Sequence, residues 1–144
     1  MLESKFSHVD LVCTSLERSL AFYRGLLAPL GWNREGQIVG ERGEEVHYLN
    51  ARGSGVASLG LREKQSDARE VPYDRYAVGM HHLALAATSR DVVDERAGWL
   101  REQGATIESG PEEYGSTPGY YAVFFYDPDG IKLEIVHRPV EGWG

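Results

Sequence analysis

Two stretches of the chain repeat the same order of hydrophobic patterns. Each begins with alternating apolar and polar residues, at residues 8–13 and 82–86, which predicts a strand. Each continues with apolar residues at helical spacing, after Ser15 and after Ser89, which predicts two helices. A serine at either position caps the first turn, because its hydroxyl accepts a hydrogen bond from a free backbone amide. The two patterns lie 74 residues apart, so the sequence predicts a duplicated module.

Sequence with the pattern of strands follows each predicted helix. We expect these strands near Gln37–Glu41, Val46–Leu49, Val56–Leu61, Thr106–Glu108, Tyr120–Tyr126 and Ile131–Val136. The proline and glycine in the loop at residues 127–130 predict a hairpin between the last two strands. The sequence therefore predicts an α+β fold of two tandem βαβββ modules, which form a curved mixed sheet around a cavity. One domain spans residues 1–144, with modules at about residues 5–61 and 80–138 and a polar linker at residues 62–79.

The composition narrows the class of protein. The chain has 144 residues, of which 42% are hydrophobic and 26% charged, as in an ordinary globular protein. Its net charge of −7 gives no general reason to bind nucleic acid or an anionic membrane. Cys13 is the one cysteine, so no disulfide joins two parts of the chain. With no apolar run long enough to span a bilayer and no signal-peptide pattern, we expect a cytoplasmic protein.

Three side chains are candidates for metal coordination. His8 and His82 open the first strand of each module at equivalent positions, and Glu134 interrupts the otherwise apolar last strand. If the modules pack around a pseudo-twofold axis, both imidazoles face one cavity and Glu134 joins them. Two imidazoles and one carboxylate form the facial triad that holds non-haem Fe²⁺, and Zn²⁺, Mn²⁺ and Ni²⁺ accept similar ligands. Strand alternation places His81 on the opposite face, where it has a structural role.

The chain resembles the vicinal oxygen chelate superfamily, which includes glyoxalase I, extradiol dioxygenases, fosfomycin-resistance transferases and bleomycin-resistance proteins. The resemblance rests on four segments: residues 7–11, 21–27, 82–85 and 124–134, the last reading FFYDPDGIKLE. It implies the fold predicted above, metal ligands on the first and last strand of each module, and a homodimer. The modules pair within one chain or are exchanged between two.

The resemblance also bears on the reaction. Counting from the glycines of the loop before the last strand of the first module reaches Leu59 or Ala57, and neither supplies the fourth ligand of glyoxalase I. The set of His8, His82 and Glu134 is similar to that of extradiol dioxygenases and fosfomycin-resistance transferases. In an extradiol enzyme a nearby histidine and tyrosine handle protons, and His47 and Tyr121, with Tyr120 beside it, supply these residue types.

We therefore expect a metal-dependent enzyme whose small substrate chelates the metal through two adjacent oxygens. A ring-cleaving dioxygenase ranks first and a lyase or isomerase second. A thiol transferase acting on an antibiotic is a third possibility, for which Arg52, Arg75 and Lys132 could bind a phosphonate. The alternative class is a metal-free protein that binds an aromatic or antibiotic ligand, as bleomycin-resistance proteins do; Glu112 and Glu113 would suit a cationic drug.

Overall fold

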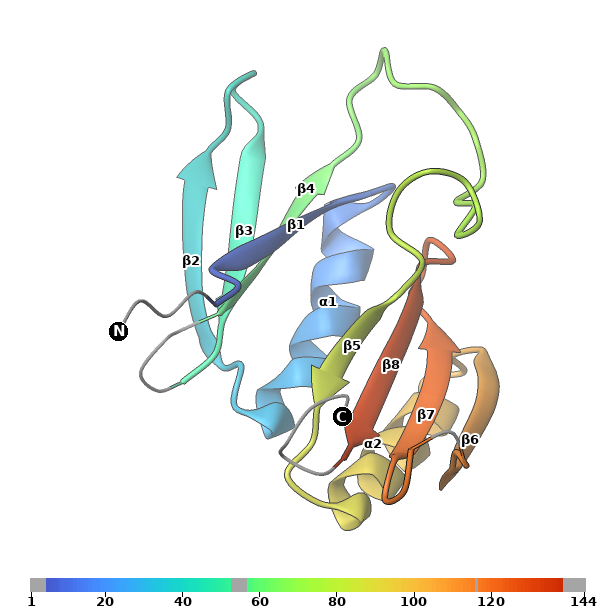
Figure 1. Cartoon of the computed structure of the whole chain (residues 1–144). Coiled ribbons are helices and arrows are strands. Elements are labelled where there is room, and N and C mark those ends of the chain that lie inside the picture. The colour runs from blue at the N-terminus through green and yellow to red at the C-terminus, as the bar shows by residue number, and fades with distance from the viewer. Residues whose placement is uncertain (1–4, 53–56, 116, 139–144) are drawn as a thin grey trace. The chain divides into compact units, whose positions relative to one another are not determined.

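The computed structural model describes residues 5–52, 57–115 and 117–138 of the chain (Figure 1). These residues belong to two compact units, residues 1–70 and 71–144. Each unit contains a four-stranded mixed sheet and a helix, which confirms the predicted α+β fold of two tandem modules.

The first unit contains four strands, an α-helix and a short 3-10 helix. Their bounds are β1 His8–Cys13, α1 Leu16–Leu27, η1 Ala28–Leu30, β2 Arg34–Val39, β3 Glu45–Asn50 and β4 Ser58–Glu63. The strand order is β1-β4-β3-β2; β1 runs parallel to β4, and the other pairs are antiparallel. The parallel pair is possible because α1 and the two following strands give the chain length to cross back over the sheet.

The second unit repeats this topology. Its elements are β5 Leu83–Ala86, α2 Arg90–Glu102, β6 Ile107–Glu113, β7 Tyr121–Tyr126 and β8 Lys132–His137, and the strand order is β5-β8-β7-β6. Strand β6 is longer than the sequence predicts, and its pairing with β7 contains two register shifts. The predicted hairpin joins β7 to β8; Gly130 has a φ of 82°, which glycine adopts without steric cost. The side chain of Asp127 accepts hydrogen bonds from the amides of Asp129 and Ile131 in this turn.

Both predicted helix caps are confirmed. Ser15 Oγ accepts a hydrogen bond from the backbone amide of Arg18 at 3.3 Å, and Ser89 Oγ accepts one from that of Val92 at 3.3 Å. Each bond satisfies an amide that has no partner within its helix. Because both caps lie directly after the first strand of a unit, they fix where that strand ends and the helix begins.

Each helix packs against one face of its own sheet, and the other face carries both polar and apolar side chains. In the first unit the buried apolar residues include Leu11, Cys13, Tyr23, Leu26, Leu27, Leu49, Leu59 and Leu61. In the second unit they include Leu85, Val93, Ala97, Leu100, Val123, Phe125, Leu133 and Ile135. Side chains alternate between the two faces of a strand, so the residues between these apolar positions lie on what we call the open face of each sheet.

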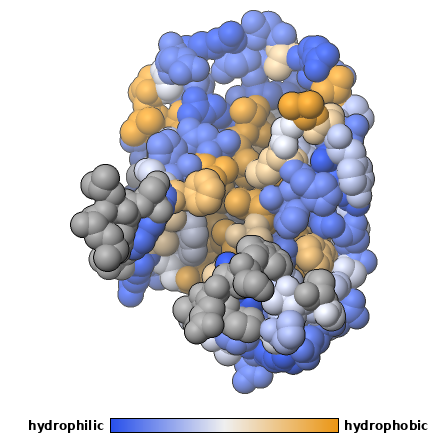
Figure 2. Space-filling view, viewed as in Figure 1, coloured by the Kyte–Doolittle hydropathy of each residue, from blue (hydrophilic) through white to orange (hydrophobic). Residues whose placement is uncertain are grey.

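Hydrophilic residues make up much of the surface visible in Figure 2, with hydrophobic residues between them. Val12 and Ile38, which share the open face of the first sheet, are more than half exposed. No helix in the described part of the chain is long and apolar enough to cross a membrane.

Candidate metal centre

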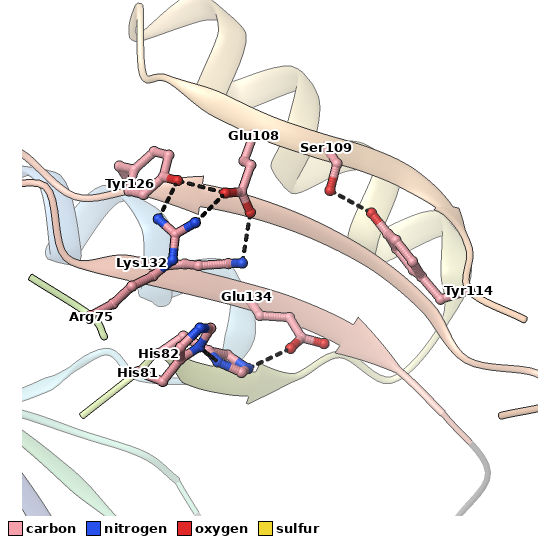
Figure 3. A network of polar contacts seen from close by, with 9 residues as sticks. All are labelled: Arg75, His81, His82, Glu108, Ser109, Tyr114, Tyr126, Lys132 and Glu134. Carbon is pink, nitrogen blue, oxygen red and sulfur yellow. Dashed lines mark hydrogen bonds and ion pairs between the residues drawn. The ribbon is translucent and has the colours of Figure 1, made fainter. Parts of the chain in front are cut away.

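The structure brings together two of the predicted ligands, His82 and Glu134. Glu134 on β8 is the register partner of Ala84 on β5, and its side chain lies on the open face of the second sheet; His82 lies directly before β5, which begins at Leu83. His82 Nε2 is 3.1 Å from Glu134 Oε1 (Figure 3). The side chain of Glu134 is 1% exposed and that of His82 is 32% exposed. The pair therefore combines a buried carboxylate with an imidazole that solvent can reach.

A tyrosine completes the surroundings of the buried carboxylate. The Tyr120 hydroxyl donates a hydrogen bond to Glu134 Oε2, the oxygen that His82 does not contact. Burial, with this hydrogen bond to a carboxylate, raises the pKa of Tyr120, so its hydroxyl keeps its proton. Tyr120 also packs with Ala122 and Val136 in a small apolar cluster. A carboxylate buried beside apolar groups is costly unless both oxygens have partners, and here both do.

His81 contacts the other side of the His82 ring. The two Nδ1 atoms are 2.8 Å apart, and the ring centroids are separated by 5.0 Å (Figure 3). The prediction that His81 points to the opposite face is wrong, because β5 begins only at Leu83 and strand alternation does not apply before it. Desolvation lowers the pKa of His81, with a smaller contribution from the charge on His82.

Two cations share one carboxylate on the same open face. Glu108 Oε2 lies 2.7 Å from Lys132 Nζ, and Glu108 Oε1 accepts hydrogen bonds from Arg75 at 3.0 Å and from the Tyr126 hydroxyl at 2.7 Å (Figure 3). Lys132 lies two residues before Glu134 on β8 and so shares its face. The two cations and one carboxylate leave this cluster with a net positive charge.

In the first unit, His8 lies at the start of β1 on the open face of its sheet. Its Nδ1 atom is 3.0 Å from Ser7 Oγ. Its ring packs edge-on against the ring of Tyr48, with 6.1 Å between the ring centroids. Asp10 lies on the same face, where its carboxylate accepts hydrogen bonds from Arg62 at 2.6 Å and from the Tyr48 hydroxyl at 3.1 Å. Asp10 is thus already held by two donors from its own sheet.

The register of the first sheet shows which residue of β4 corresponds to Glu134, and it differs from the residues predicted by counting from the loop glycines. Asp10 pairs with Gly60 as Ala84 pairs with Glu134, so Gly60, and neither Leu59 nor the residue at 57, is the counterpart of Glu134. Counting from the loop glycines failed because the loop before β4 differs in length from the turn before β8. A glycine offers no donor atom, and the expectation that this strand supplies no ligand is unaffected.

The residues predicted to handle protons lie on the helix-facing sides of their sheets. His47 shares a face with Leu61 and Leu49, and its Nε2 is 3.8 Å from Glu35 Oε1. The Tyr121 hydroxyl donates a hydrogen bond to Asp94 of α2. Neither residue shares the open face that carries His8 in the first unit and Glu134 in the second. Tyr120, the neighbour named with Tyr121, is the tyrosine that reaches Glu134.

The sequence contained a signal that distinguishes Tyr120 from Tyr121. In an antiparallel hairpin the register partners keep a constant sum of residue numbers, and β7 pairs Phe124 with Glu134 and Ala122 with Val136. Even-numbered residues of this hairpin therefore share a face, which assigns Tyr120 rather than Tyr121 to the side of Glu134. For His81 the sequence held no comparable signal, because its contact depends on irregular backbone before β5.

The chemistry of the pair fits a divalent cation. An imidazole nitrogen and a carboxylate oxygen are the donor types that Fe²⁺, Mn²⁺ and Zn²⁺ take in three-ligand sites. His82 and Glu134 present such atoms side by side on one face. Among the described residues, neither unit by itself contains three His, Cys, Asp or Glu side chains placed to hold a metal ion. His8, the third predicted ligand, belongs to the first unit.

Comparisons with known proteins agree with this architecture. The family model described as the Glyoxalase/Bleomycin resistance protein/Dioxygenase superfamily matches residues 5–135. The uncharacterized protein YqjT of Bacillus subtilis is 30% identical over 130 residues, which cover 90% of this chain and 95% of YqjT.

Two solved structures show the same fold. A glyoxylase/bleomycin resistance protein/dioxygenase domain from Frankia sp. EAN1pec has a TM-score of 0.75 and 25% identity, and the match covers 99% of this chain and 96% of that domain. The fosfomycin resistance protein FosX from Listeria monocytogenes has a TM-score of 0.63 and 19% identity, covering 97% and 98% of the two chains. At that identity the likeness to FosX concerns the fold alone.

The duplicated βαβββ topology, with a histidine and a buried carboxylate side by side in its second unit, is that of a glyoxalase-like protein. The chain belongs to the Glyoxalase/Bleomycin resistance protein/Dioxygenase superfamily.

Proposed function

We propose that the protein is a metal-dependent enzyme acting on a small substrate that chelates the metal through two adjacent oxygens. His82 and Glu134 supply two ligands, and His8 supplies the third, either from the same chain or from a second copy in a homodimer. The bound metal would act as a Lewis acid that holds both substrate oxygens and stabilises negative charge on them. A ring-cleaving dioxygenase or a lyase or isomerase remains the leading reaction type.

One observation carries the proposal. Glu134 is almost fully buried on a sheet face, yet its Oε1 lies 3.1 Å from the imidazole of His82. A buried carboxylate is destabilising unless it is paired, and an apolar residue would serve the sheet better if packing were its purpose. A ligand pair for a cation explains both the charge and the neighbouring imidazole. The FosX protein, which shares this fold, has been crystallised with Mn(II) and a sulfate ion, so a protein of this fold can hold a divalent cation.

The residues around the pair have separable roles in this proposal. Tyr120 holds Glu134 Oε2 and orients the carboxylate, because its raised pKa keeps the hydroxyl a donor. Phe124, the register partner of Glu134, forms an apolar wall beside His82, with 6.0 Å between the ring centroids. Such a wall would suit a flat or small substrate bound beside His82.

The charge of the cluster formed by Arg75, Lys132 and Glu108 favours an anionic substrate over a cationic one. Lys132 Nζ lies 4.8 Å from the centroid of the Phe124 ring, and Arg75 joins it at Glu108. The net positive charge of this cluster would attract a second acidic group on a chelating substrate. This observation keeps open the thiol transferase with an anionic antibiotic, and it does not favour a metal-free protein that binds a cationic drug.

Metal titration tests the proposal. Metal-stripped wild-type protein should bind one Zn²⁺ or Mn²⁺ per site by isothermal titration calorimetry, and saturating metal should raise its melting temperature. The variants Glu134→Gln, His82→Ala and His8→Ala should each lose stoichiometric binding. His137→Gln is the matched control, because His137 lies on β8 with its Nδ1 bound to the Ala87 carbonyl. If Glu134→Gln retains wild-type affinity, the enzymatic proposal is rejected and a metal-free binding protein takes its place.

A further inference from the structure

The residue before each candidate ligand histidine contacts the Nδ1 atom of that histidine. Ser7 Oγ is 3.0 Å from His8 Nδ1 in the first unit, and His81 Nδ1 is 2.8 Å from His82 Nδ1 in the second. Ser7 and His81 lie 74 residues apart, the same offset that relates His8 to His82. We propose that Ser7 and His81 are positioning residues that occupy Nδ1 of each ligand histidine and leave Nε2 for the metal. This inference rests on the proposed metal site.

The second unit shows which atom each partner takes. His82 Nε2 faces Glu134 Oε1, and His82 Nδ1 faces His81, so the two ring nitrogens of His82 have different partners (Figure 3). An ionised carboxylate only accepts hydrogen bonds, so without metal the proton of a neutral His82 lies on Nε2. His82 Nδ1 then accepts a hydrogen bond from the Nδ1–H group of His81.

A ligand role for His82 reverses this hydrogen bond. A neutral imidazole that binds a cation through Nε2 carries its proton on Nδ1, which must then be a donor. His81 accepts that bond if its own proton moves to Nε2. The protons balance in this change. His81 gives the proton on its Nδ1 to Nδ1 of His82. His82 releases its Nε2 proton to solvent, and His81 takes up one proton from solvent on its Nε2. An imidazole at position 81 serves both states, whereas an apolar side chain serves neither.

The backbone makes these contacts possible. Side chains of adjacent residues in a regular strand point to opposite faces and do not meet. Ser7 precedes β1, which begins at His8, and His81 precedes β5, which begins at Leu83. The first residue of each contact therefore precedes the strand. The ring of His81 also forms a T-shaped contact with the ring of Tyr76, with 5.2 Å between the ring centroids. Metal-bound histidines generally have such a partner, which fixes the ring orientation and the tautomer.

The serine in the first unit performs the same task with different chemistry. A hydroxyl donates or accepts, so Ser7 can bind His8 Nδ1 in either tautomer. Serine and histidine differ in volume and shape, so a common packing role does not account for their contacts at corresponding positions. What they share is a polar atom within reach of Nδ1.

Two substitutions at position 81 separate positioning from packing. In His81→Asn the amide can take the place of Nδ1, whereas His81→Leu fills the space without a polar atom. We expect His81→Leu to weaken Zn²⁺ binding by about 10- to 100-fold in calorimetric titration and His81→Asn to stay within about threefold of wild type. Ser7→Ala should weaken binding in the same direction, and Ser7→Thr should restore it. His137→Gln again serves as control and should leave Zn²⁺ affinity unchanged.

A second readout reports the tautomer of His82 and not the metal affinity. Two-bond ¹H–¹⁵N correlation spectra of metal-free, ¹⁵N-histidine-labelled protein should show His82 protonated on Nε2, and after Zn²⁺ is added they should show it protonated on Nδ1. In His81→Leu the Zn²⁺-loaded protein should lose the defined Nδ1–H signal through exchange with water.

The outcomes distinguish this inference from the proposed function. If Glu134→Gln loses Zn²⁺ while His81→Leu binds it as wild type does, the metal site stands and the positioning role is rejected. Equal weakening in His81→Leu and His81→Asn also rejects it, since the loss would then follow from packing. If Glu134→Gln binds Zn²⁺ normally, the proposed function itself fails, whereas the tautomer assignment of metal-free His82 remains testable in the same spectra.

Discussion

The carboxylate of Asp10 fills the space above Gly60 on the open face of the first sheet. A Cβ atom at position 60 would lie 2.3 Å from Asp10 Oδ1 and 2.6 Å from the Tyr48 ring. In the second sheet the arrangement is exchanged: the small residue, Ala84, is on the first strand and the carboxylate, Glu134, on the last. Both units therefore place one carboxylate at this level of the sheet, from opposite strands. In the first unit the carboxylate binds Arg62, and in the second it faces His82.

Substitution of Gly60 should destabilise the first unit. In Gly60→Ala the new methyl group displaces Asp10 from Arg62 and from Tyr48, because both contacts hold the carboxylate over the glycine. We expect a loss of about 1–3 kcal/mol in the free energy of unfolding, measured by urea denaturation. The cost should be smaller in an Asp10→Ala background, where the clash with the carboxylate is absent and only that with the Tyr48 ring remains. An equal cost in both backgrounds would show that Asp10 does not occupy this space.

The Tyr120 hydroxyl should matter more than a neighbouring tyrosine hydroxyl. Tyr120→Phe leaves a buried carboxylate oxygen of Glu134 without its donor, and we expect a loss of about 1.5–3 kcal/mol in the free energy of unfolding. Tyr114→Phe is the control, because the Tyr114 hydroxyl binds the neutral Ser109 hydroxyl at 2.7 Å, which is worth about 1 kcal/mol. Chemical denaturation at pH 7 measures both, and equal losses would contradict the role of Tyr120.

The Glu108 cluster should give the protein a dependence on acid. The hydrogen bond from Lys132, with those from neighbouring groups, holds the pKa of Glu108 below its usual value. A carboxyl with a lowered folded-state pKa contributes stability above its unfolded pKa of about 4.3, and this contribution is lost as the pH falls through the folded-state value. The free energy of unfolding of Glu108→Gln should therefore be about 1 kcal/mol lower than that of wild type at pH 7 and approach the wild-type value near pH 3.

Denaturation curves at several pH values measure this difference. Glu45→Gln serves as a control, because Glu45 is an exposed residue of β3 in the other unit. If the difference in the free energy of unfolding between Glu108→Gln and wild type stays constant from pH 7 to pH 3, the carboxylate is not ionised in the cluster.

His47 should be replaceable with a gain in stability. Both ring nitrogens are buried and have no hydrogen-bond partner among the described residues. The nearest carboxylates, those of Glu35 and Glu45, lie 3.8 and 3.9 Å away, too far for a hydrogen bond, so the desolvation of the imidazole is poorly compensated. We expect His47→Leu to raise the free energy of unfolding by about 1 kcal/mol in urea denaturation and to leave Zn²⁺ affinity unchanged. A loss of stability or of Zn²⁺ binding would contradict this and would return His47 to the candidate site.

Local patterns in the sequence were sufficient for the architecture. Strand alternation before Ser15 and Ser89, and the helical spacing after them, depend on contacts with residues nearby in the chain. The 74-residue offset then related the two halves without any knowledge of their packing. The choice of Glu134 as a ligand also followed from one strand, since a carboxylate in an apolar run needs a partner.

Residues around the site were harder to assign, because their roles depend on register and on backbone outside the strands. Tyr121 and Tyr120 are adjacent, and only the pairing of β7 with β8 decides that Tyr120 reaches Glu134. The partner of Gly60 likewise depends on the parallel pairing of β1 with β4, which joins residues some fifty positions apart.

By itself, the sequence determined the duplicated α+β fold and the residue types available for metal binding, because both follow from periodicity and composition within short segments. Only the tertiary structure decided that His82 Nε2 meets Glu134, that His81 and Ser7 occupy the Nδ1 atoms, and that Lys132 and Arg75 share Glu108. These contacts join strands distant in sequence or irregular segments next to them. Their geometry is set by strand register and by where each strand begins, which no local pattern specifies.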